Sequence, residues 1–246
     1  MCLKHVATKK FEAHRTLDTP KPKGYGLFVR IRLEHVWLTL HDLGLKPKTV
    51  FCMCCGRGKE VQFFLSLKKE VTGLDISRDR LKDCKWKYSE NSSLLNVTVG
   101  DAETLPFTEN SFDLALVVMG LHHLPHPYQG LRELSRVSKN ALALAEIVEP
   151  LITKLLKHLA LFKTECCGAK PNRLNLMEIN NVLLSQGLTV EKTIHQFGYL
   201  PGFFGSIMSY RLEKALFKLQ QTVLRFIPSL SKVLCNEVVI IAHKPS

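Results

Sequence analysis

The sequence predicts an α/β fold in which helices cover both faces of a doubly wound sheet of mostly parallel strands. Between residues 49 and 148, short apolar runs alternate with longer stretches whose apolar residues recur at helical spacing. Glycine, aspartate and proline separate these runs. This alternation indicates a parallel sheet, because each helix has to return the chain to the start of the next strand.

The first expected element is a helix from Leu27 to about Leu43, where strong helix formers precede Gly44. Short apolar runs rich in β-forming residues predict strands at Thr49–Cys54, Glu70–Leu74, Asn96–Val99, Phe112–Met119 and Ala141–Val148. The amphipathic stretches between them predict helices at Lys59–Leu67, Ser77–Ser89 and Pro127–Ser138.

The pattern is looser beyond Pro150. We expect a helix over Leu176–Gln186 with Gly187 at its C-terminal cap, and strands over Leu188–His195 and Glu237–His243. Basic amphipathic helices are expected over Leu151–Phe162 and Ser206–Phe226. We expect the apolar stripe of the second one to pack on the domain, with a lid or an anionic membrane surface as alternatives. That stripe consists of Met208, Leu212, Leu216, Leu219, Val223 and Phe226.

The 246 residues are 46% hydrophobic and 23% charged, a composition that is typical of globular proteins and excludes a disordered chain. We expect a basic N-terminal arm over residues 1–26 and a single domain over residues 27–246, with helical inserts at about 150–175 and 198–235. No apolar run reaches the roughly 18 residues of a membrane span, and the N-terminus lacks the apolar segment of a secretory signal. We therefore expect a cytoplasmic protein whose eight cysteines are reduced thiols.

The net charge of +12 is unevenly distributed. Residues 1–50 carry 10 basic and 4 acidic groups, residues 51–150 carry 12 and 13, and residues 151–246 carry 12 and 5. The excess on the flanks predicts an anionic neighbour, either a membrane surface or nucleic acid. Nucleic acid is the less favoured partner because the basic arm has no interleaved aromatic residues.

The strongest chemical signal is the sequence TVFCMCCGRGKE at residues 49–60, where a strand runs into a glycine turn that opens a helix. Glycine lets a ligand approach the backbone, and the helix N-terminus offers unpaired N–H groups. Asp75 stands at the tip of the next predicted strand, seventeen residues after Gly58. An acid at that place can accept hydrogen bonds from both hydroxyls of a ribose, so the pattern predicts a nucleotide cofactor.

Two further segments, GDAETLPF at residues 100–107 and NSFDLALVVMGLHHLPHP at residues 110–127, complete a set of ordered motifs. Together with the glycine turn they resemble the class I S-adenosylmethionine-dependent methyltransferase family, in its small-molecule and lipid methyltransferase branch. The resemblance spans roughly residues 45–150, and EVVIIAHK near the C-terminus resembles the last strand of that family. It implies a Rossmann-like seven-stranded sheet with one antiparallel C-terminal strand, and S-adenosyl-L-methionine as cofactor.

The resemblance also assigns cofactor-binding residues, position by position. The loop beneath the methionine part of the cofactor corresponds to Cys54, Gly56 and Gly58. Asp75 matches the ribose-binding acid and Ile76 the apolar residue against the adenine. The adenine amino group would be received by Asp101, with Ala102 beside it, and the sulfonium would face Val117 and Val118.

The chain departs from the family pattern at two positions. Cys52 stands where the family usually has an acid, and Cys54 where it usually has glycine. The missing carboxylate would help hold the amino group of the cofactor, and one charge-assisted hydrogen bond contributes about 1.5–3 kcal/mol. Its loss predicts that cofactor binding is weaker by an order of magnitude or more, without being abolished.

The cysteines at 52–55, with Cys166 and Cys167, could suggest a metal or metalloid site. We expect small buried thiols and no metal, because residues 52 and 54 of a strand point to one side while residues 53 and 55 point to the other.

His122 and His123 follow the fourth predicted strand of the alternating part and are the candidates for a general base. A structural role is favoured, because the LHHL motif accompanies unrelated substrates and a methyl transfer often requires only alignment of the nucleophile.

The sequence therefore predicts a methyltransferase that transfers a methyl group directly, by an SN2 step, to a small-molecule or lipid-like acceptor. The loop after His123 and the two inserts would surround the acceptor. Two alternatives stay open: an RNA methyltransferase that uses the basic flanks, and a catalytically degenerate protein that binds the cofactor or a partner. The sequence identifies neither the acceptor atom nor the oligomeric state.

Overall fold

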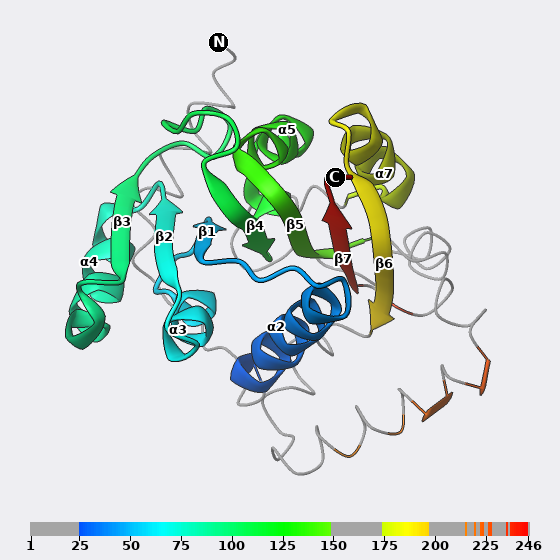
Figure 1. The fold of residues 1–246 in the computed structure, drawn as a ribbon, viewed down its shortest axis with the longest axis horizontal. Helices are drawn as coiled ribbons and strands as arrows, with labels where there is room; N and C mark the ends of the chain where they lie inside the picture. The colour runs from blue at the N-terminus through cyan, green and yellow to red at the C-terminus, as the bar shows by residue number, and fades with distance from the viewer. Residues whose placement is uncertain are drawn as a thin grey trace, which may run out of the picture.

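The computed structural model describes residues 25–148, 174–196 and 237–245, together with seven single positions from Ala215 to Cys235 (Figure 1). The expected arm lies outside the described residues up to position 24, as do most of the two expected inserts and the whole expected helix over Leu151–Phe162.

A seven-stranded sheet forms the centre of the described fold, with the strand order β3-β2-β1-β4-β5-β7-β6. Its strands are β1 (Thr49–Met53), β2 (Glu70–Asp75), β3 (Leu95–Val99), β4 (Phe112–Val118), β5 (Ser138–Ile147), β6 (Thr189–Gln196) and β7 (Glu237–His243). β1 to β5 pair in parallel, and β7 lies antiparallel between β5 and β6. The expected α/β fold, with one antiparallel C-terminal strand, is confirmed.

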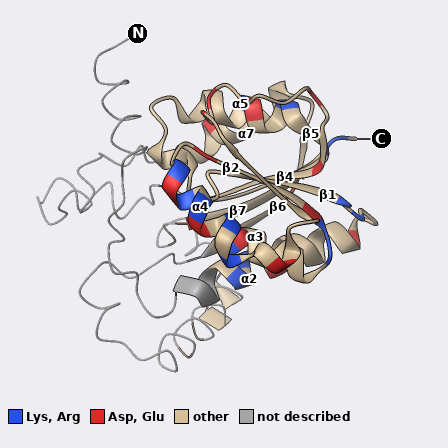
Figure 2. Cartoon of the chain, turned by 90° about the vertical axis from the view of Figure 1, so that its left-hand side faces the viewer, with Lys and Arg blue, Asp and Glu red and all other residues tan. Residues whose placement is uncertain are grey.

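Helices cover both faces of this sheet, as Figure 2 shows most clearly. One face carries α2 (Tyr25–Asp42), α3 (Lys59–Ser66) and α4 (Arg78–Lys87), and the other carries α5 (Pro127–Val137) and α7 (Leu176–Ser185). Two short 3-10 helices, η1 (Ser89–Asn91) and η2 (Leu121–His123), follow α4 and β4. Lys, Arg, Asp and Glu concentrate on the helices and the loops at the strand ends (Figure 2).

The ends of three helices follow from local chemistry. The Ser77 side chain caps α4 by accepting a hydrogen bond from the N–H of Arg80. Gly44 and Gly187 follow α2 and α7 with φ angles of 71° and 72°, the left-handed conformation that glycine adopts without penalty. The prediction that Gly187 ends the helix is therefore confirmed.

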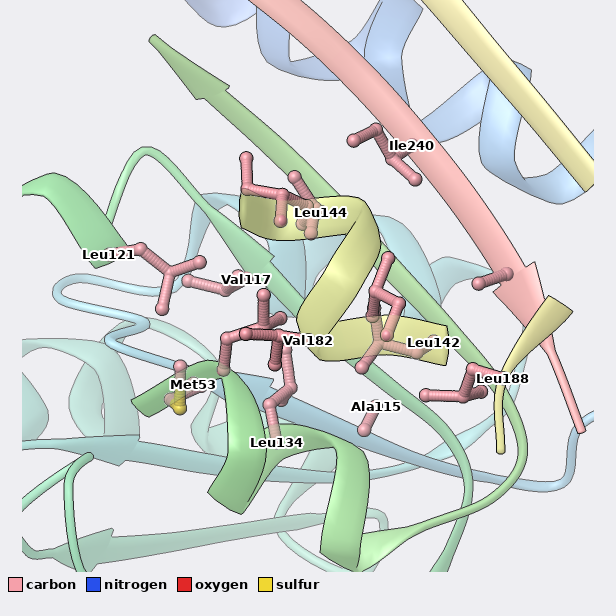
Figure 3. Close-up of a cluster of buried hydrophobic side chains, with 14 of the residues drawn as sticks. Met53, Ala115, Val117, Leu121, Leu134, Leu142, Leu144, Val182, Leu188 and Ile240 are labelled. Atoms are coloured by element: carbon pink, nitrogen blue, oxygen red, sulfur yellow. The ribbon is translucent and has the colours of Figure 1, made fainter. Parts of the chain in front are cut away.

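The core consists of two apolar clusters, one on each face of the sheet. On the α5 and α7 face, alternate residues of the central strands pack against the helices, as Figure 3 shows for Val117, Leu134, Leu144, Val182 and Ile240. The opposite cluster contains the apolar stripe of α2, formed by Val29, Leu33, Val36 and Leu40. Strands buried on both sides explain the nearly continuous apolar runs in the sequence.

Two expectations about the first strand and its cysteines are wrong. β1 ends at Met53, because Cys54 has a φ of 55° and leaves the extended conformation. The predicted alternation of the cysteines therefore fails after Met53. Cys52 and Cys55 lie in the α2 and α3 cluster, whereas Cys54 packs against the opposite one.

The apolar stripe expected over Ser206–Phe226 does not pack on the domain at the positions that the structure describes. Leu219, Val223 and Phe226 are helical and exposed.

A buried ion pair that the sequence did not predict connects α2 to β7. Arg32 and Glu237 are 1% and 0% exposed, and Nη2 of Arg32 donates to a carboxylate oxygen of Glu237 over 2.5 Å. Because Glu237 pairs with Ile147, it begins β7 at the carboxyl edge of β5. Among the described helices, none has the length and apolarity to cross a membrane.

Candidate cofactor-binding site

The candidate site lies where the carboxyl ends of β1, β2, β3 and β4 meet (Figure 1). Carboxyl ends of neighbouring parallel strands share one edge of a sheet, where ligands bind in open α/β folds. The glycine turn after β1 is anchored to β2, because the N–H of Cys55 donates to the carbonyl of Leu74 over 3.0 Å.

Glycine is required at the two positions of the turn for different structural reasons. Gly58 has a φ of 74°, and a Cβ at this position would lie 2.4 Å from Sγ of Cys84 and 3.0 Å from the Tyr88 ring. It therefore lets the start of α3 pack closely against α4. A Cβ at Gly56 would meet nothing closer than 4.0 Å, with Arg80 and Asp75 as its nearest neighbours. The space beside Gly56 is open for a ligand.

Asp75 lies directly beside this open space and is 5% exposed. Its Oδ2 accepts a hydrogen bond of 2.8 Å from the N–H of Gly56, and its Oδ1 accepts one of 2.9 Å from the N–H of Ser77. Each oxygen of a carboxylate has a second lone pair, so both can accept one further hydrogen bond. This arrangement is suited to a pair of vicinal hydroxyls.

The loop after β3 lies beside the loop after β2, because the N–H of Gly100 donates to the carbonyl of Asp75 over 3.1 Å. Asp101 is partly exposed, and its Oδ1 accepts a hydrogen bond of 2.9 Å from the N–H of Glu103. Ala102 is buried in the core, and Ile76 is partly exposed. The residues predicted to surround the adenine thus come from two neighbouring loops.

Cys54 stands at the base of the site. Burial raises the pKa of its thiol well above the usual value, and the nearby carboxylates of Asp75, Glu146, Glu60 and Asp101 raise it further. The thiol of Cys54 therefore stays neutral at physiological pH. A left-handed backbone costs a residue other than glycine roughly 1–2 kcal/mol, which is the penalty of Cys54 at a glycine position.

The end of β4 forms the remaining wall. Val118 is its last residue and is partly exposed, whereas Val117 is fully buried in the cluster under α5 and α7. Gly120 follows and faces Cys54, since a Cβ at Gly120 would lie 2.6 Å from the Cβ of Cys54. The contacts of these two valines with a cofactor stay a prediction.

The two candidate histidines have different surroundings. His122 is 4% exposed, and its Nδ1 lies 2.7 Å from Oε2 of Glu146. The second carboxylate oxygen of Glu146 accepts hydrogen bonds of 2.7 and 2.6 Å from the N–H groups of Gly120 and Leu121. His123 is partly exposed, and its ring centroid is 4.1 Å from that of His122.

Glu146 was missed by sequence reasoning. It is fully buried on the face of α5 and α7, at the end of β5. An acid in the otherwise apolar run ALALAEIV is the signal that could have revealed it, because an acid placed inside a buried strand requires hydrogen-bond donors around it.

Glu103 is a second residue that was missed. Its carboxylate is 6% exposed, accepts a hydrogen bond of 2.7 Å from the N–H of His126, and lies 3.3 Å from Nδ1 of the same residue. It thereby fixes the start of α5 next to the loop that carries Asp101.

Cys52, at the position of the missing acid, is fully buried, and burial raises the pKa of its thiol well above the usual value. Among the described residues, no group of His, Cys, Asp and Glu has an arrangement that could hold a metal ion. Cys166 and Cys167 lie outside those residues.

Comparisons with known proteins agree with this geometry. Residues 51–142 match the model of a methyltransferase domain family. A demethylmenaquinone methyltransferase from Staphylococcus aureus (strain JH9) is 34% identical over 143 residues, which are 53% of this chain and 57% of that protein. The chain therefore matches just over half the length of this relative.

Solved structures show the same fold. A methyltransferase-like protein from Bacillus halodurans superposes with a TM-score of 0.63 at 17% identity, covering 89% of this chain and 99% of that one. Magnesium protoporphyrin IX methyltransferase from Synechocystis, solved with bound S-adenosylmethionine, superposes with a TM-score of 0.61 at 12% identity, covering 100% and 98%. Over residues 51–142 this chain is therefore similar to a methyltransferase domain family, and its fold is that of the solved methyltransferases.

Proposed function

We propose that the chain transfers a methyl group from S-adenosylmethionine to a small-molecule, lipid-like acceptor by direct SN2 displacement. The observation that carries this proposal is the pairing of Asp75 with Gly56. The carboxylate is fixed by two backbone N–H groups and keeps two lone pairs beside the open face of the glycine turn. The residues present therefore fit the ribose of such a cofactor.

Each predicted residue has a role in this proposal. Asp75 accepts hydrogen bonds from the ribose hydroxyls, and Asp101 accepts one from the adenine amino group. Ile76 and Ala102 cover the adenine. The methionine part lies over the turn of Cys54, Gly56 and Gly58, and the sulfonium faces the end of β4 at Val117 and Val118.

The cofactor would supply an electrophilic methyl carbon. The nucleophilic atom of the acceptor forms a bond to that carbon, while the electron pair of the carbon–sulfur bond stays on sulfur. The chain contributes alignment of the two reactants and exclusion of water.

Glu146 and His122 serve this alignment by fixing the loop after β4. Because Nδ1 of His122 is within hydrogen-bond distance of the Glu146 carboxylate, we assign His122 a positioning role. His123 is the candidate general base for an acceptor that has to lose a proton.

A small-molecule acceptor is supported by the names of two similar proteins, a demethylmenaquinone methyltransferase and a magnesium protoporphyrin IX methyltransferase. The test is to incubate the full chain with cofactor carrying an isotopically labelled methyl group in a cell extract, and to separate lipid, small-molecule and RNA fractions. Label in the lipid or small-molecule fraction supports the proposal. Label confined to RNA would replace it with RNA methylation.

RNA methylation is the second candidate, and the net charge of +12 favours it. Binding that depends on phosphate contacts weakens steeply with added salt. A steep loss of methyl transfer between low and physiological salt would support RNA as substrate. A flat salt profile supports the small-molecule acceptor.

A further inference from the structure

Two cysteine thiols lie next to each other where the glycine turn packs against α4. Sγ of Cys84, on α4, fills the space beside Gly58, where a Cβ would lie 2.4 Å from it. The thiol of Cys55, in the turn, donates a hydrogen bond to Sγ of Cys84. An ion pair joins the same two segments, because Nε of Arg57 lies 2.7 Å from a carboxylate oxygen of Asp83. The turn and α4 therefore hold these two sulfur atoms in contact.

The hydrogen bond makes the two thiols chemically different. It lowers the pKa of the Cys84 thiol, although burial opposes this shift, and the nearby Lys87 lowers the pKa further. The same hydrogen bond, together with burial, raises the pKa of the Cys55 thiol well above its usual value. The thiolate is the form of cysteine that reacts with oxidants. Cys84 is therefore the thiol of the pair that an oxidant modifies first, and Cys55 is the neighbouring thiol that can react with the product.

Access to the pair depends on how firmly α4 is packed. Of the ten residues of this helix, Leu81 and Cys84 are the buried ones. The helix lies against β3, the strand at one edge of the sheet (Figure 1). Elements with little buried apolar surface open locally at a low cost in free energy. Hydrogen peroxide is scarcely larger than water, so a small local opening of α4 is enough for it to reach the Cys84 thiol.

We propose that Cys55 and Cys84 are a redox-sensitive pair that hydrogen peroxide converts to a reversible disulfide. The Cys84 thiolate attacks one peroxide oxygen, a sulfur–oxygen bond forms as the oxygen–oxygen bond breaks, and the leaving hydroxide takes up the thiol proton as water. The sulfur of Cys55 then attacks the sulfenic acid on Cys84, and the sulfur–oxygen bond breaks as a second water leaves with the Cys55 proton. Two thiols are thereby oxidised to one disulfide, and one peroxide is reduced to two waters.

The disulfide would change the geometry of the candidate cofactor site. Its two sulfur atoms lie about 2.05 Å apart, closer than two hydrogen-bonded thiols, so its formation draws the turn and α4 together. Asp75 accepts one hydrogen bond from Gly56 in the turn and another from Ser77 at the start of α4. Because the reduced arrangement fits a ribose, the oxidised protein should bind the cofactor more weakly. This consequence rests on the proposed function, whereas the disulfide itself does not.

The first experiment identifies the disulfide directly. The full chain is treated with hydrogen peroxide, the remaining thiols are blocked with N-ethylmaleimide, and the protein is digested with trypsin without reduction. Trypsin releases Cys55 in the peptide 49–57 and Cys84 in the peptide 83–85. Mass spectrometry should detect these two peptides as one cross-linked species, which separates into its two parts on treatment with dithiothreitol. Absence of this species after exposure to excess peroxide would overturn the proposal.

Substitutions assign the two sulfur atoms. Cys55→Ser and Cys84→Ser should each abolish the cross-linked species. Cys52→Ser is the matched control, because it removes another buried thiol from the same tryptic peptide and should leave the species unchanged. Circular dichroism verifies that the three variants are folded. A cross-linked species that persists in Cys55→Ser, or that is lost in Cys52→Ser, would show that a different cysteine reacts and would overturn the assignment.

A second experiment tests the effect on the cofactor site. Calorimetric titration with S-adenosylmethionine should give an affinity about tenfold lower for the oxidised chain, as expected for the loss of one hydrogen bond to a carboxylate, and dithiothreitol should restore it. Equal affinities of the two forms would contradict the effect of the disulfide on the site. An absence of binding by the reduced chain would instead contradict the proposed function, and the peptide result would still decide whether the disulfide forms.

Discussion

The carboxylate of Glu146 lies 2.7 Å from Nδ1 of His122, and both side chains are buried. The same carboxylate accepts hydrogen bonds from two consecutive backbone N–H groups, those of Gly120 and Leu121. One side chain at the end of β5 therefore fixes the loop at the end of β4, which forms a wall of the candidate site.

Replacing Glu146 with glutamine is expected to destabilise the protein. The amide keeps one acceptor oxygen but loses the charge and places an N–H₂ donor against other donors. The expected decrease in the free energy of unfolding is about 1–3 kcal/mol, measured by urea denaturation. Glu90→Gln, at an exposed position in η1, should change it by less than about 0.5 kcal/mol. If the two variants were equally stable, Glu146 would not hold the loop.

A pair of glycine substitutions separates steric from conformational effects. Gly44 and Gly58 have φ angles of 71° and 74°, but only Gly58 has close neighbours, whereas a Cβ at Gly44 would meet nothing within 4 Å. Gly44→Ala should therefore cost roughly 1–2 kcal/mol through its backbone conformation alone. Gly58→Ala should cost a further 1–3 kcal/mol or so from the contact with Cys84. Urea denaturation of both variants measures the difference, and equal costs would contradict the close packing of α3 on α4.

The buried pair of Arg32 and Glu237 predicts a double-mutant result. Arg32→Met leaves the carboxylate of Glu237 buried without its guanidinium and should cost about 3–5 kcal/mol. Adding Glu237→Leu should recover most of that loss, because two apolar side chains replace two buried charges. Chemical denaturation of the two single variants and the double variant measures this coupling. Additive losses would mean that the two side chains act independently.

The contribution of Glu133 to the stability of the protein should be lost at acidic pH. Hydrogen bonds of 2.8 Å from Arg136 lower the pKa of the Glu133 carboxyl, although partial burial opposes this shift. A lowered pKa in the folded state contributes stability above the unfolded value of about 4.3, which is lost as the pH falls through the folded value.

Glu133→Gln should therefore be less stable than the unmodified chain at pH 7, and the gap between them should narrow as the pH falls below about 4. Urea denaturation across this pH range measures the gap. A gap that stays constant would show that the ionised carboxylate contributes nothing.

The sequence predicted most of the fold because the apolar pattern of a parallel sheet is local. The final strand was expected over Glu237–His243, where the structure places β7, and Gly187 ends its helix as expected. Asp75 was expected at the tip of the second strand, and it is the last residue of β2.

What the sequence did not reveal depends on contacts between distant residues. Arg32 and Glu237 are 205 positions apart, and Glu146 binds a loop 24 to 26 positions earlier. The end of β1 was misplaced because the left-handed conformation of Cys54 is unusual for any residue other than glycine or asparagine. The exposure of the Leu219 and Phe226 side chains could not be predicted either. Helical spacing shows which residues share a face of a helix, but not whether another element covers that face.

The central claim, that Asp75 and the glycine turn bind S-adenosylmethionine, is tested most directly by calorimetric titration of the full chain with this cofactor. We expect saturable binding, weakened about tenfold or more in Asp75→Asn and unchanged in Asp79→Asn, which alters an exposed acid on α4. An absence of binding at millimolar cofactor, or an equal loss of affinity in the two variants, would contradict the account.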